Sequence, residues 1–201
     1  MKNQFTTITA PSEGFLKEKG SKFLSFAIPV DSEDSVKDVL DNLRKTYYDA
    51  RHYCYAYVIG LKKQSFRAND DGEPNHSAGD PILGQIRSKE LTNTLVVVVR
   101  YFGGTKLGVG GLISAYKIAA EDALNNATFK TIYAKKEVKI DFGYDSTSEV
   151  ERVLGDIDIT YLDKTYTDRC VFTMMLKDED CPILLKKTEL MADVKIEIRE
   201  D

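Results

Sequence analysis

Residues 67–116 read RANDDGEPNHSAGDPILGQIRSKELTNTLVVVVRYFGGTKLGVGGLISAY, a stretch unlike the rest of the 201-residue chain. An acidic turn leads into a short helical segment, a continuously apolar strand, a glycine-rich loop and a second helix. Five of the nine residues from Gly103 to Gly111 are glycine. Because glycine costs backbone entropy, this density indicates positive φ angles or a close approach of backbone. We therefore expect the functional centre here and scaffold elsewhere.

The surrounding sequence predicts an α+β domain over residues 1–134. Patterns of β-rich and helix-spaced apolar residues predict strands over about 5–16, 23–30, 52–60 and 94–101, and helices over about 33–46 and 110–127. Ser32 is the expected N-cap of the first helix. Asp80-Pro81 resembles an N-cap followed by proline at the first helical position, which predicts a short helix before the strand at 94–101. That strand should be central and covered on both faces, because it is apolar throughout before Arg100.

The strand at 52–60 carries tyrosine on every second residue. Tyr53, Tyr55 and Tyr57 share one face, and small residues take the other. Two interpretations stay open at this point. The tyrosine face is either a half-exposed binding surface or a covered sheet face whose hydroxyls reach water.

After Tyr133 a second pattern begins. We expect strands over about 137–144, 157–166, 169–177 and 194–198, with one helix that opens after Ser146 and contains Val150, Val153 and Leu154, and another over about 181–189. Ser146 and Glu149 have the spacing of a capping box. The order βαββαβ is that of the split-βαβ, ferredoxin-like arrangement. We place the domain boundary near Ala134, which gives domains over 1–134 and 135–201.

Charge and cysteine content exclude several classes of protein. Residues 1–134 hold 17 Lys and Arg against 15 Asp and Glu, whereas residues 135–201 hold 11 against 17. Neither part is basic enough for strong non-specific DNA binding by the whole chain. Three widely spaced cysteines without a CxxC pair predict reduced thiols in a cytoplasmic protein. We expect no membrane segment and no secretory signal.

The glycine-rich loop is the first candidate site. Amides exposed by Gly103, Gly104, Gly108, Gly110 and Gly111 at the start of a helix would form an anion site, and Arg100 and Lys106 would add positive charge. Phosphate of a nucleotide or of an RNA backbone is the natural ligand. The spacing fits neither a Walker A loop nor the dinucleotide G-x-G-x-x-G motif. A tight crossover without ligand is the equally open alternative.

The acidic turn is the second candidate. Asp70, Asp71, Glu73 and Asp80 lie close enough in sequence to bind Mg²⁺ or to act as acid and base, but they also suit a turn and a helix cap. His76 lies in the same loop and is either a ligand contact or a solvated side chain. No nucleophile–histidine pattern is visible, and we expect no cofactor and no bound metal.

These motifs together resemble the YigZ/IMPACT family. The residues that carry the resemblance are Asp70-Asp-Gly-Glu-Pro74, Ala78-Gly79, Pro81-Ile-Leu83, Leu91-Thr-Asn93, Arg100-Tyr-Phe-Gly-Gly104, Lys106-Leu-Gly108, Gly110-Gly-Leu112, Ala115-Tyr116, His52-Tyr-Cys-Tyr-Ala-Tyr57 and Ser21-Lys-Phe23. This chain departs from the family pattern at His76-Ser77, usually Gly-Thr, and at Asp80, often a basic residue.

The resemblance implies a two-domain α+β protein. Its first domain would resemble the second domain of a ribosomal protein, a fold also seen in domain IV of a translation factor, and its second would be ferredoxin-like. Eukaryotic relatives are linked to translation control under stress, and the bacterial members have no established activity. The implied partners are RNA, the ribosome or a translation-control protein.

Three hypotheses follow. The first is a non-enzymatic protein that binds RNA, the ribosome or another phosphate-bearing partner through the loop, with Tyr53 and Tyr55 stacking on bases. The second is an enzyme that acts on a phosphorylated small molecule or nucleotide, with Mg²⁺ held by Asp70, Asp71 and Glu73. The third is an adaptor that offers the acidic unit 135–201 to a basic protein.

Overall fold

The computed structural model describes residues 3–199, and its internal contacts divide the chain into two compact units. The N-terminal unit comprises Phe5–Ile132. Among the described residues, the C-terminal unit comprises residues 133–199 together with residues 3–4. Within the described residues the chain is a mixed α/β structure with two large antiparallel sheets and five α-helices, and none of these helices is long and apolar enough to cross a membrane.

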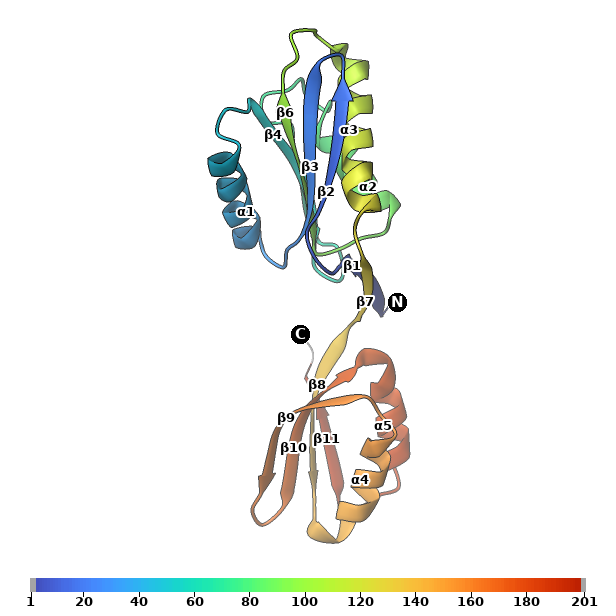
Figure 1. Ribbon diagram of the computed structural model, residues 1–201. Coiled ribbons are helices and arrows are strands. Elements are labelled where there is room, and N and C mark those ends of the chain that lie inside the picture. The colour runs from blue at the N-terminus through green and yellow to red at the C-terminus, as the bar shows by residue number, and fades with distance from the viewer. Residues whose placement is uncertain (1–2, 200–201) are drawn as a thin grey trace. The chain divides into compact units, whose positions relative to one another are not determined.

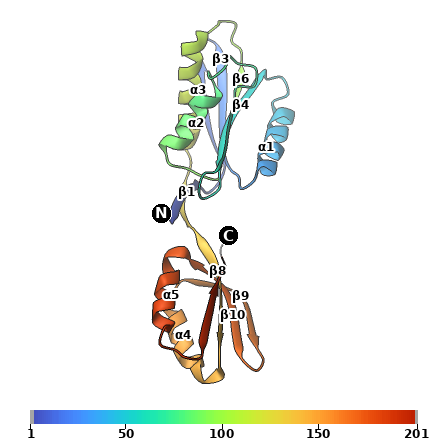
Figure 2. The same cartoon turned by 180° about the vertical axis from the view of Figure 1, so that it is seen from behind.

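The first sheet is five-stranded, antiparallel and ordered β2-β3-β6-β4-β5, and β1 and β7 form a separate two-stranded sheet. Figure 1 shows α1 on one face of the five-stranded sheet and α2 and α3 on the other, and Figure 2 shows the same layers from behind. The elements are β1 Gln4–Ile8, β2 Ser12–Glu18, β3 Ser21–Pro29, α1 Glu33–Thr46, β4 His52–Ile59, β5 Ser65–Asn69, α2 Gly79–Ser88, β6 Thr94–Tyr101, α3 Gly108–Asn125 and β7 Phe129–Tyr133.

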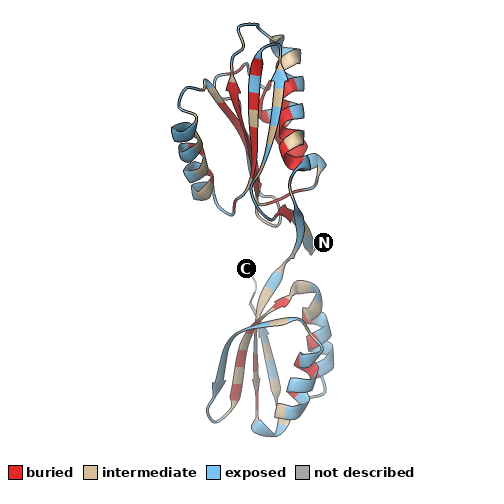
Figure 3. Ribbon diagram, viewed as in Figure 1, coloured by how far each residue is buried: buried red, intermediate tan, exposed pale blue. Residues whose placement is uncertain are grey.

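Strand β6 is the centre of the core, as its uninterrupted apolar sequence predicts. It lies third of the five strands, and every residue from Leu95 to Val99 is fully buried. Val96 and Val98 pack with α2 and α3, and the alternate residues pack with α1. Figure 3 shows the resulting band of buried residues along the sheet. Burial on both faces explains why this strand does not alternate between apolar and polar residues.

Helix α1 begins as predicted, and it determines how far the tyrosine side chains of β4 are exposed. The Ser32 hydroxyl accepts a hydrogen bond from the Ser35 amide at 3.2 Å, and the Ser35 hydroxyl accepts from the Ser32 amide at 3.3 Å. The apolar face of the helix covers the tyrosine face of β4, so Tyr53 is 7% exposed and Tyr55 8% exposed. The expectation of a half-exposed tyrosine surface is therefore wrong.

Several predicted boundaries are also wrong. The single strand expected over 5–16 is interrupted before Ser12, where Pro11 lacks the amide that a continuous strand needs. Strands β5 and β7, each of only five residues, are additional to the predicted strands; β5 borders the turn-forming residues of the acidic loop, and β7 does not alternate between apolar and polar residues. Asp80 is not the N-cap of α2, because the helix begins at Gly79 with Ala78 at the cap position.

The C-terminal unit contains the predicted series of strands and helices. Its four-stranded antiparallel sheet has the order β11-β8-β10-β9, and Phe142, Phe172 and Met174 are fully buried beneath its two helices. The capping box at Ser146 is absent, because Ser146 has helical backbone angles and its side chain caps nothing. The elements are β8 Lys135–Phe142, η1 Tyr144–Ser146, α4 Thr147–Gly155, β9 Ile159–Tyr166, β10 Cys170–Lys177, η2 Asp178–Asp180, α5 Cys181–Thr188 and β11 Val194–Ile198.

The β2–β3 hairpin lies directly against the start of the glycine-rich loop. A Cβ atom added to Gly103 would collide with the backbone of Gly20 and Ser21, and one added to Gly20 would lie 2.7 Å from the carbonyl oxygen of Gly103. By contrast, nothing lies within 4 Å of the position that a Cβ atom would take at Gly110. Glycine is therefore required sterically at Gly103 and not at Gly110.

We expect Gly103→Ala to destabilise the chain by about 1–3 kcal/mol, because two backbone segments must separate to admit the methyl group. Gly110→Ala is the matched control in the same loop. It should be neutral or stabilising by about 0.5–1 kcal/mol, because alanine favours the helix. Urea unfolding followed by circular dichroism measures both, and equal stability of the two variants would contradict the close approach at Gly103.

Candidate functional site

One end of the five-stranded sheet gathers the sequence motifs. Strand β6 ends there at Tyr101, and β3 and β4 begin there, since Lys22 pairs with Tyr101 and His52 pairs with Arg100. We call it the motif end. The β2–β3 hairpin, the acidic loop that follows β5 and the glycine-rich loop that follows β6 all lie at this end of the sheet (Figure 1).

A buried ion pair lies beneath these loops. The Arg100 guanidinium donates to Glu73 Oε1 at 2.5 Å, and the side chains are 6% and 5% exposed. The Tyr116 hydroxyl donates to the same oxygen at 2.8 Å. These contacts join β6, the acidic loop and α3 inside the domain. Arg100 and Glu73 are thus neutralised by each other and do not face solvent.

Arg100 also connects the hairpin to the glycine-rich loop through Ser21. Its second terminal nitrogen lies 3.3 Å from the Ser21 hydroxyl oxygen, which accepts a hydrogen bond from the Gly103 amide at 3.1 Å. The guanidinium lies over the rings of Phe23 and Phe102, 5.4 and 5.7 Å from their centroids. The first residue of the glycine-rich loop is therefore fixed in place from below.

Burial suppresses the reactivity of the remaining polar groups in this network. The Cys54 sulfur lies 3.0 Å from the carbonyl oxygen of Asp70 and 3.3 Å from the Tyr116 hydroxyl. Burial raises the pKa of the Cys54 thiol, so it is not a thiolate at neutral pH. Burial, with the neighbouring Cys54 and Glu73, also raises the pKa of Tyr116, which stays protonated and able to donate.

Asp70 is the residue that caps α2. One carboxylate oxygen accepts hydrogen bonds from the amides of Ala78 and Gly79 at 2.9 and 2.8 Å, and the other accepts from the His76 amide at 2.8 Å. Burial acts to raise the pKa of Asp70, but the three amide hydrogen bonds outweigh it and hold that pKa below its ordinary value. The role predicted for Asp80 belongs to Asp70.

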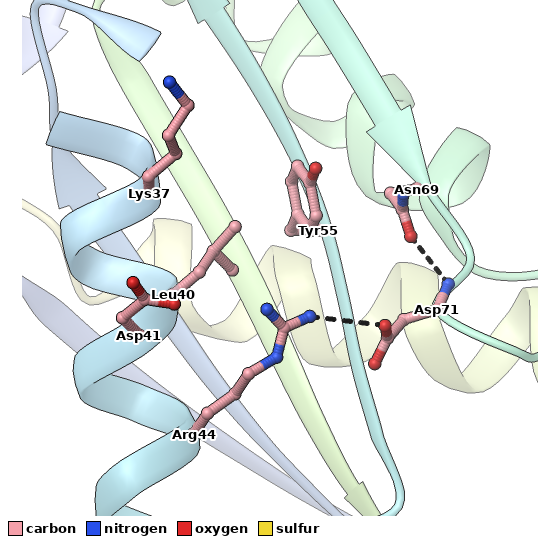
Figure 4. A pocket seen from close by; sticks show the side chains of 7 residues that line it. All are labelled: Lys37, Leu40, Asp41, Arg44, Tyr55, Asn69 and Asp71. Carbon is pink, nitrogen blue, oxygen red and sulfur yellow. Dashed lines mark hydrogen bonds and ion pairs between the residues drawn. The ribbon is translucent and has the colours of Figure 1, made fainter. Parts of the chain in front are cut away.

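Asp71 holds the acidic loop against β4 and α1. One of its carboxylate oxygens accepts from the Tyr53 amide at 2.7 Å, and the other lies 3.4 Å from the Arg44 guanidinium. An open pocket of about 350 Å³ lies beside this contact, with Arg44 and Asp71 facing each other across it (Figure 4). Its lining consists of Lys37, Leu40, Asp41, Arg44, Tyr55, Asn69 and Asp71.

The three candidate carboxylates thus do not converge on a common point. Asp70 caps a helix, Asp71 faces β4 and α1, and Glu73 is buried against Arg100. Over residues 3–199, no group of three or more His, Cys, Asp or Glu side chains is arranged to hold a metal ion. The acid–base or Mg²⁺ arrangement expected as an alternative does not fit these residues.

His76 and Asp80 form a separate pair on the surface. The His76 Nδ1 atom lies 2.6 Å from a carboxylate oxygen of Asp80, with the side chains 81% and 54% exposed. His76 has a positive φ of 63°, which places it in a turn. Its backbone amide is used by Asp70, and its ring is open to solvent.

The glycine-rich loop stays open beyond Gly103. Helix α3 begins at Gly108 with Leu107 at the cap position, and no side chain caps it. In the described part of the chain, no hydrogen bond takes up the amides of residues 104–107. Lys106 is exposed and forms no ion pair with any described residue. Gly104 and Gly108 have positive φ angles of 86° and 72°, which explains glycine at both positions.

Sequence reasoning missed the roles of Tyr116, Cys54, Ser21 and Asp70 in this network. Tyr116 carries a signal for its role, because the hydroxyl of a tyrosine buried by a helix usually has a hydrogen-bond partner. Asp70 gave no local signal, since it caps a helix that begins nine residues later in the chain.

Comparison with known proteins agrees with the motifs. A sequence model of the Impact N-terminal domain matches residues 19–124. The chain is 28% identical over 200 residues to IMPACT family member YvyE of Bacillus subtilis, covering 100% of this chain and 92% of that protein. It is 33% identical over 150 residues to IMPACT family member YigZ of Escherichia coli, covering 74% of each. A crystal structure of a hypothetical protein superposes with a TM-score of 0.74 and 26% identity over 100% of both chains.

Removing one partner of the buried ion pair should be strongly destabilising. We expect Glu73→Ala to lower the free energy of unfolding by about 3–5 kcal/mol, because it leaves the Arg100 charge buried and unpaired. Asp80→Ala removes an exposed carboxylate and should cost less than about 1 kcal/mol. Urea unfolding compares the two, and similar losses would show that Glu73 does not neutralise Arg100.

The amide cage of Asp70 should make stability depend on pH in acid. The ordinary pKa is 3.8 and the folded value lies below it, so this stabilisation is present above 3.8 and is lost as pH falls through the folded pKa. We expect Asp70→Asn to cost about 2 kcal/mol at neutral pH. That difference should shrink progressively below about pH 5. A difference that stays constant from neutral pH to pH 2 would contradict this assignment.

Proposed function

The chain belongs to the IMPACT family, and from this premise we propose that it is a non-enzymatic binding protein of the translation or stress-response apparatus. Its partner would carry phosphate, as RNA or the ribosome does. The partner would bind at the motif end, through the glycine-rich loop and Lys106. A protein that controls translation is the alternative to RNA or the ribosome as the partner.

The openness of the loop carries this proposal. Amides without partners at residues 104–107, an uncapped helix terminus and the exposed cation of Lys106 occur in one segment. Backbone amides and a helix N-terminus attract anions, and a lysine adds a mobile positive charge. Gly110 supports the same view, because neither a positive φ nor crowding requires glycine there. A side chain at this position would come between a ligand and the exposed backbone.

The set of proposed contact residues is smaller than the sequence implied. Arg100 is 5% exposed and paired with Glu73, so we assign it to positioning Gly103 and not to contact with the partner. Tyr53 and Tyr55 are buried beneath α1, so we do not propose that they contact the partner. Gly104, Lys106, Gly108, Gly110 and Gly111 remain, and His76 is an exposed neighbour in the acidic loop.

Our proposal also includes a fold assignment for each of the two domains. We propose a ribosomal-protein second-domain-like fold for residues 1–134 and a ferredoxin-like fold for residues 135–201. The βαββαβ order and the strand order β11-β8-β10-β9 support the second assignment. For the first domain, support comes from the match to the Impact N-terminal domain over residues 19–124.

Lys106→Ala should weaken RNA binding and reduce its salt dependence. Removing one phosphate contact is expected to lower the slope of log affinity against log salt by roughly 0.7–1, whatever the RNA sequence. Fluorescence anisotropy with a labelled single-stranded RNA at several salt concentrations measures both quantities. Gly110→Ala should also weaken binding without loss of stability.

The matched control is Lys62→Ala, which removes an exposed lysine at the opposite end of the same sheet, in the β4–β5 turn. It should leave both affinity and slope unchanged. Equal losses in Lys62→Ala and Lys106→Ala, or no binding of RNA or ribosomes by the wild-type chain at low salt, would refute the proposal. Saturable binding of a nucleotide with Mg²⁺ instead would favour an enzyme.

A further inference from the structure

The β2–β3 hairpin carries an unusual pair of like charges. Lys17 and Lys22 are direct partners in the antiparallel register, and both are exposed. Side chains at such positions lie about 4.5–5.5 Å apart at Cβ, and like charges there are destabilising. Lys19, in the turn between them, is exposed too and has a positive φ of 45°. The hairpin thus concentrates three cations at the motif end.

No acid neutralises these three lysines. They form no ion pair with any residue in the described part of the chain. Glu18, the nearest acid in sequence, pairs in register with Ser21 and so lies on the other face of the hairpin. Some lysines elsewhere are paired, as in Lys37–Asp34 at 2.7 Å, Lys187–Asp156 at 2.7 Å and Lys177–Asp158 at 3.2 Å, whereas others, such as Lys106, form no ion pair with a described residue. The positive charge of the hairpin is therefore open to an anionic ligand.

An exposed aromatic ring accompanies the lysines. Phe15 lies two residues before Lys17, hence on the same face of β2, and is 53% exposed. Phe102, at the start of the loop after β6, is also exposed, but it lies on the other face of the sheet with Phe23, because the Arg100 guanidinium lies over both rings. Aromatic rings beside lysines are the combination that binds single-stranded RNA, because rings stack on unpaired bases and cations contact phosphates.

The hairpin is also held against the glycine-rich loop. The backbones of Gly20 and Gly103 touch, and the Ser21 hydroxyl accepts from the Gly103 amide. Lys22 pairs in register with Tyr101, two residues before Gly103. A ligand that binds one segment therefore meets the other at a fixed place.

We propose that Lys17, Lys19 and Lys22, with Phe15, form a second binding surface that takes a single RNA strand long enough to reach the glycine-rich loop as well. This inference rests on the proposed function and adds the chemical class and extent of the ligand. The hairpin contacts successive phosphates, and the Phe15 ring contacts a base. A mononucleotide is too short to use both segments.

The double variant Lys17→Ala/Lys22→Ala tests this surface in the full chain with a 12-nucleotide oligouridine. Two lost phosphate contacts are expected to lower the salt slope by roughly 1.4–1.8. The control Lys62→Ala/Lys130→Ala removes two exposed lysines outside the motif end and should not change the slope. Phe15→Leu should weaken binding by about five-fold or more, because one stacking contact is lost.

A second measurement separates binding from folding. Lys22→Glu replaces the like-charge pair by an opposite-charge pair, so it should raise the midpoint of thermal unfolding while it lowers affinity for the oligonucleotide. A hairpin with a purely structural role would not show a higher unfolding midpoint together with a lower affinity for the oligonucleotide. If Lys22→Glu changes neither quantity, the unpaired charges have no consequence and the inference is wrong.

Failure of the hairpin surface is distinguishable from failure of the proposed function. If Lys106→Ala loses affinity and the hairpin double variant binds as the wild type does, the loop contacts RNA and the hairpin does not. If no variant differs because the wild-type chain does not bind, both proposals are wrong. If poly-glutamate competes with the oligonucleotide at equal charge, the partner is an acidic protein and not RNA.

Discussion

The structure depends on one buried charge pair, Arg100 with Glu73. Burying two charges is costly unless each satisfies the other and further hydrogen bonds complete the site. Here the Tyr116 hydroxyl and the Ser21 hydroxyl supply two such bonds, from α3 and from the hairpin, while Arg100 Nε has no hydrogen-bond partner among residues 3–199. The pair therefore forms only when β6, the acidic loop, α3 and β3 are all in place. A buried pair of this kind contributes less to net stability than to fixing how segments distant in sequence meet.

This constraint divides the family motif into two groups of residues. Asp70, Glu73 and Arg100 look like catalytic groups in the sequence, yet their side chains are used by helix amides and by each other. The residues left on the surface are glycines, lysines and His76. A motif rich in carboxylates thus supports this end of the sheet from inside, and backbone amides, Lys106 and His76 lie on its surface.

The sequence predicted those features that depend on local pattern. Strand β6 followed from its uninterrupted apolar run, and α1 followed from Ser32 and its apolar spacing. Features set by distant partners could not be predicted. Alternation showed that Tyr53 and Tyr55 share a face but could not show that α1 covers it. Asp80-Pro81 had the form of a helix start, yet Asp70 captures the amides of Ala78 and Gly79 first and begins α2 earlier. The helical backbone of Ser146 likewise removes its capping role.

At the motif end Gly103 is fixed, whereas residues 104–107 are open to solvent. This difference determines the kind of affinity that the motif end can have for a ligand. Gly103 is fixed by Ser21 and by the hairpin, whereas residues 104–107 make no hydrogen bonds of their own through their amides. Ordering such a glycine-rich segment around a ligand costs conformational entropy. Electrostatic attraction must offset this entropy cost, because the exposed groups of the motif end are mainly backbone amides and lysines. Since residues 135–201 carry the excess of acid and residues 1–134 do not, the attraction that we propose for a polyanion would come from residues 1–134. Affinity at this site should therefore be electrostatic in origin and weak in sequence preference, as suits recognition of a phosphate backbone.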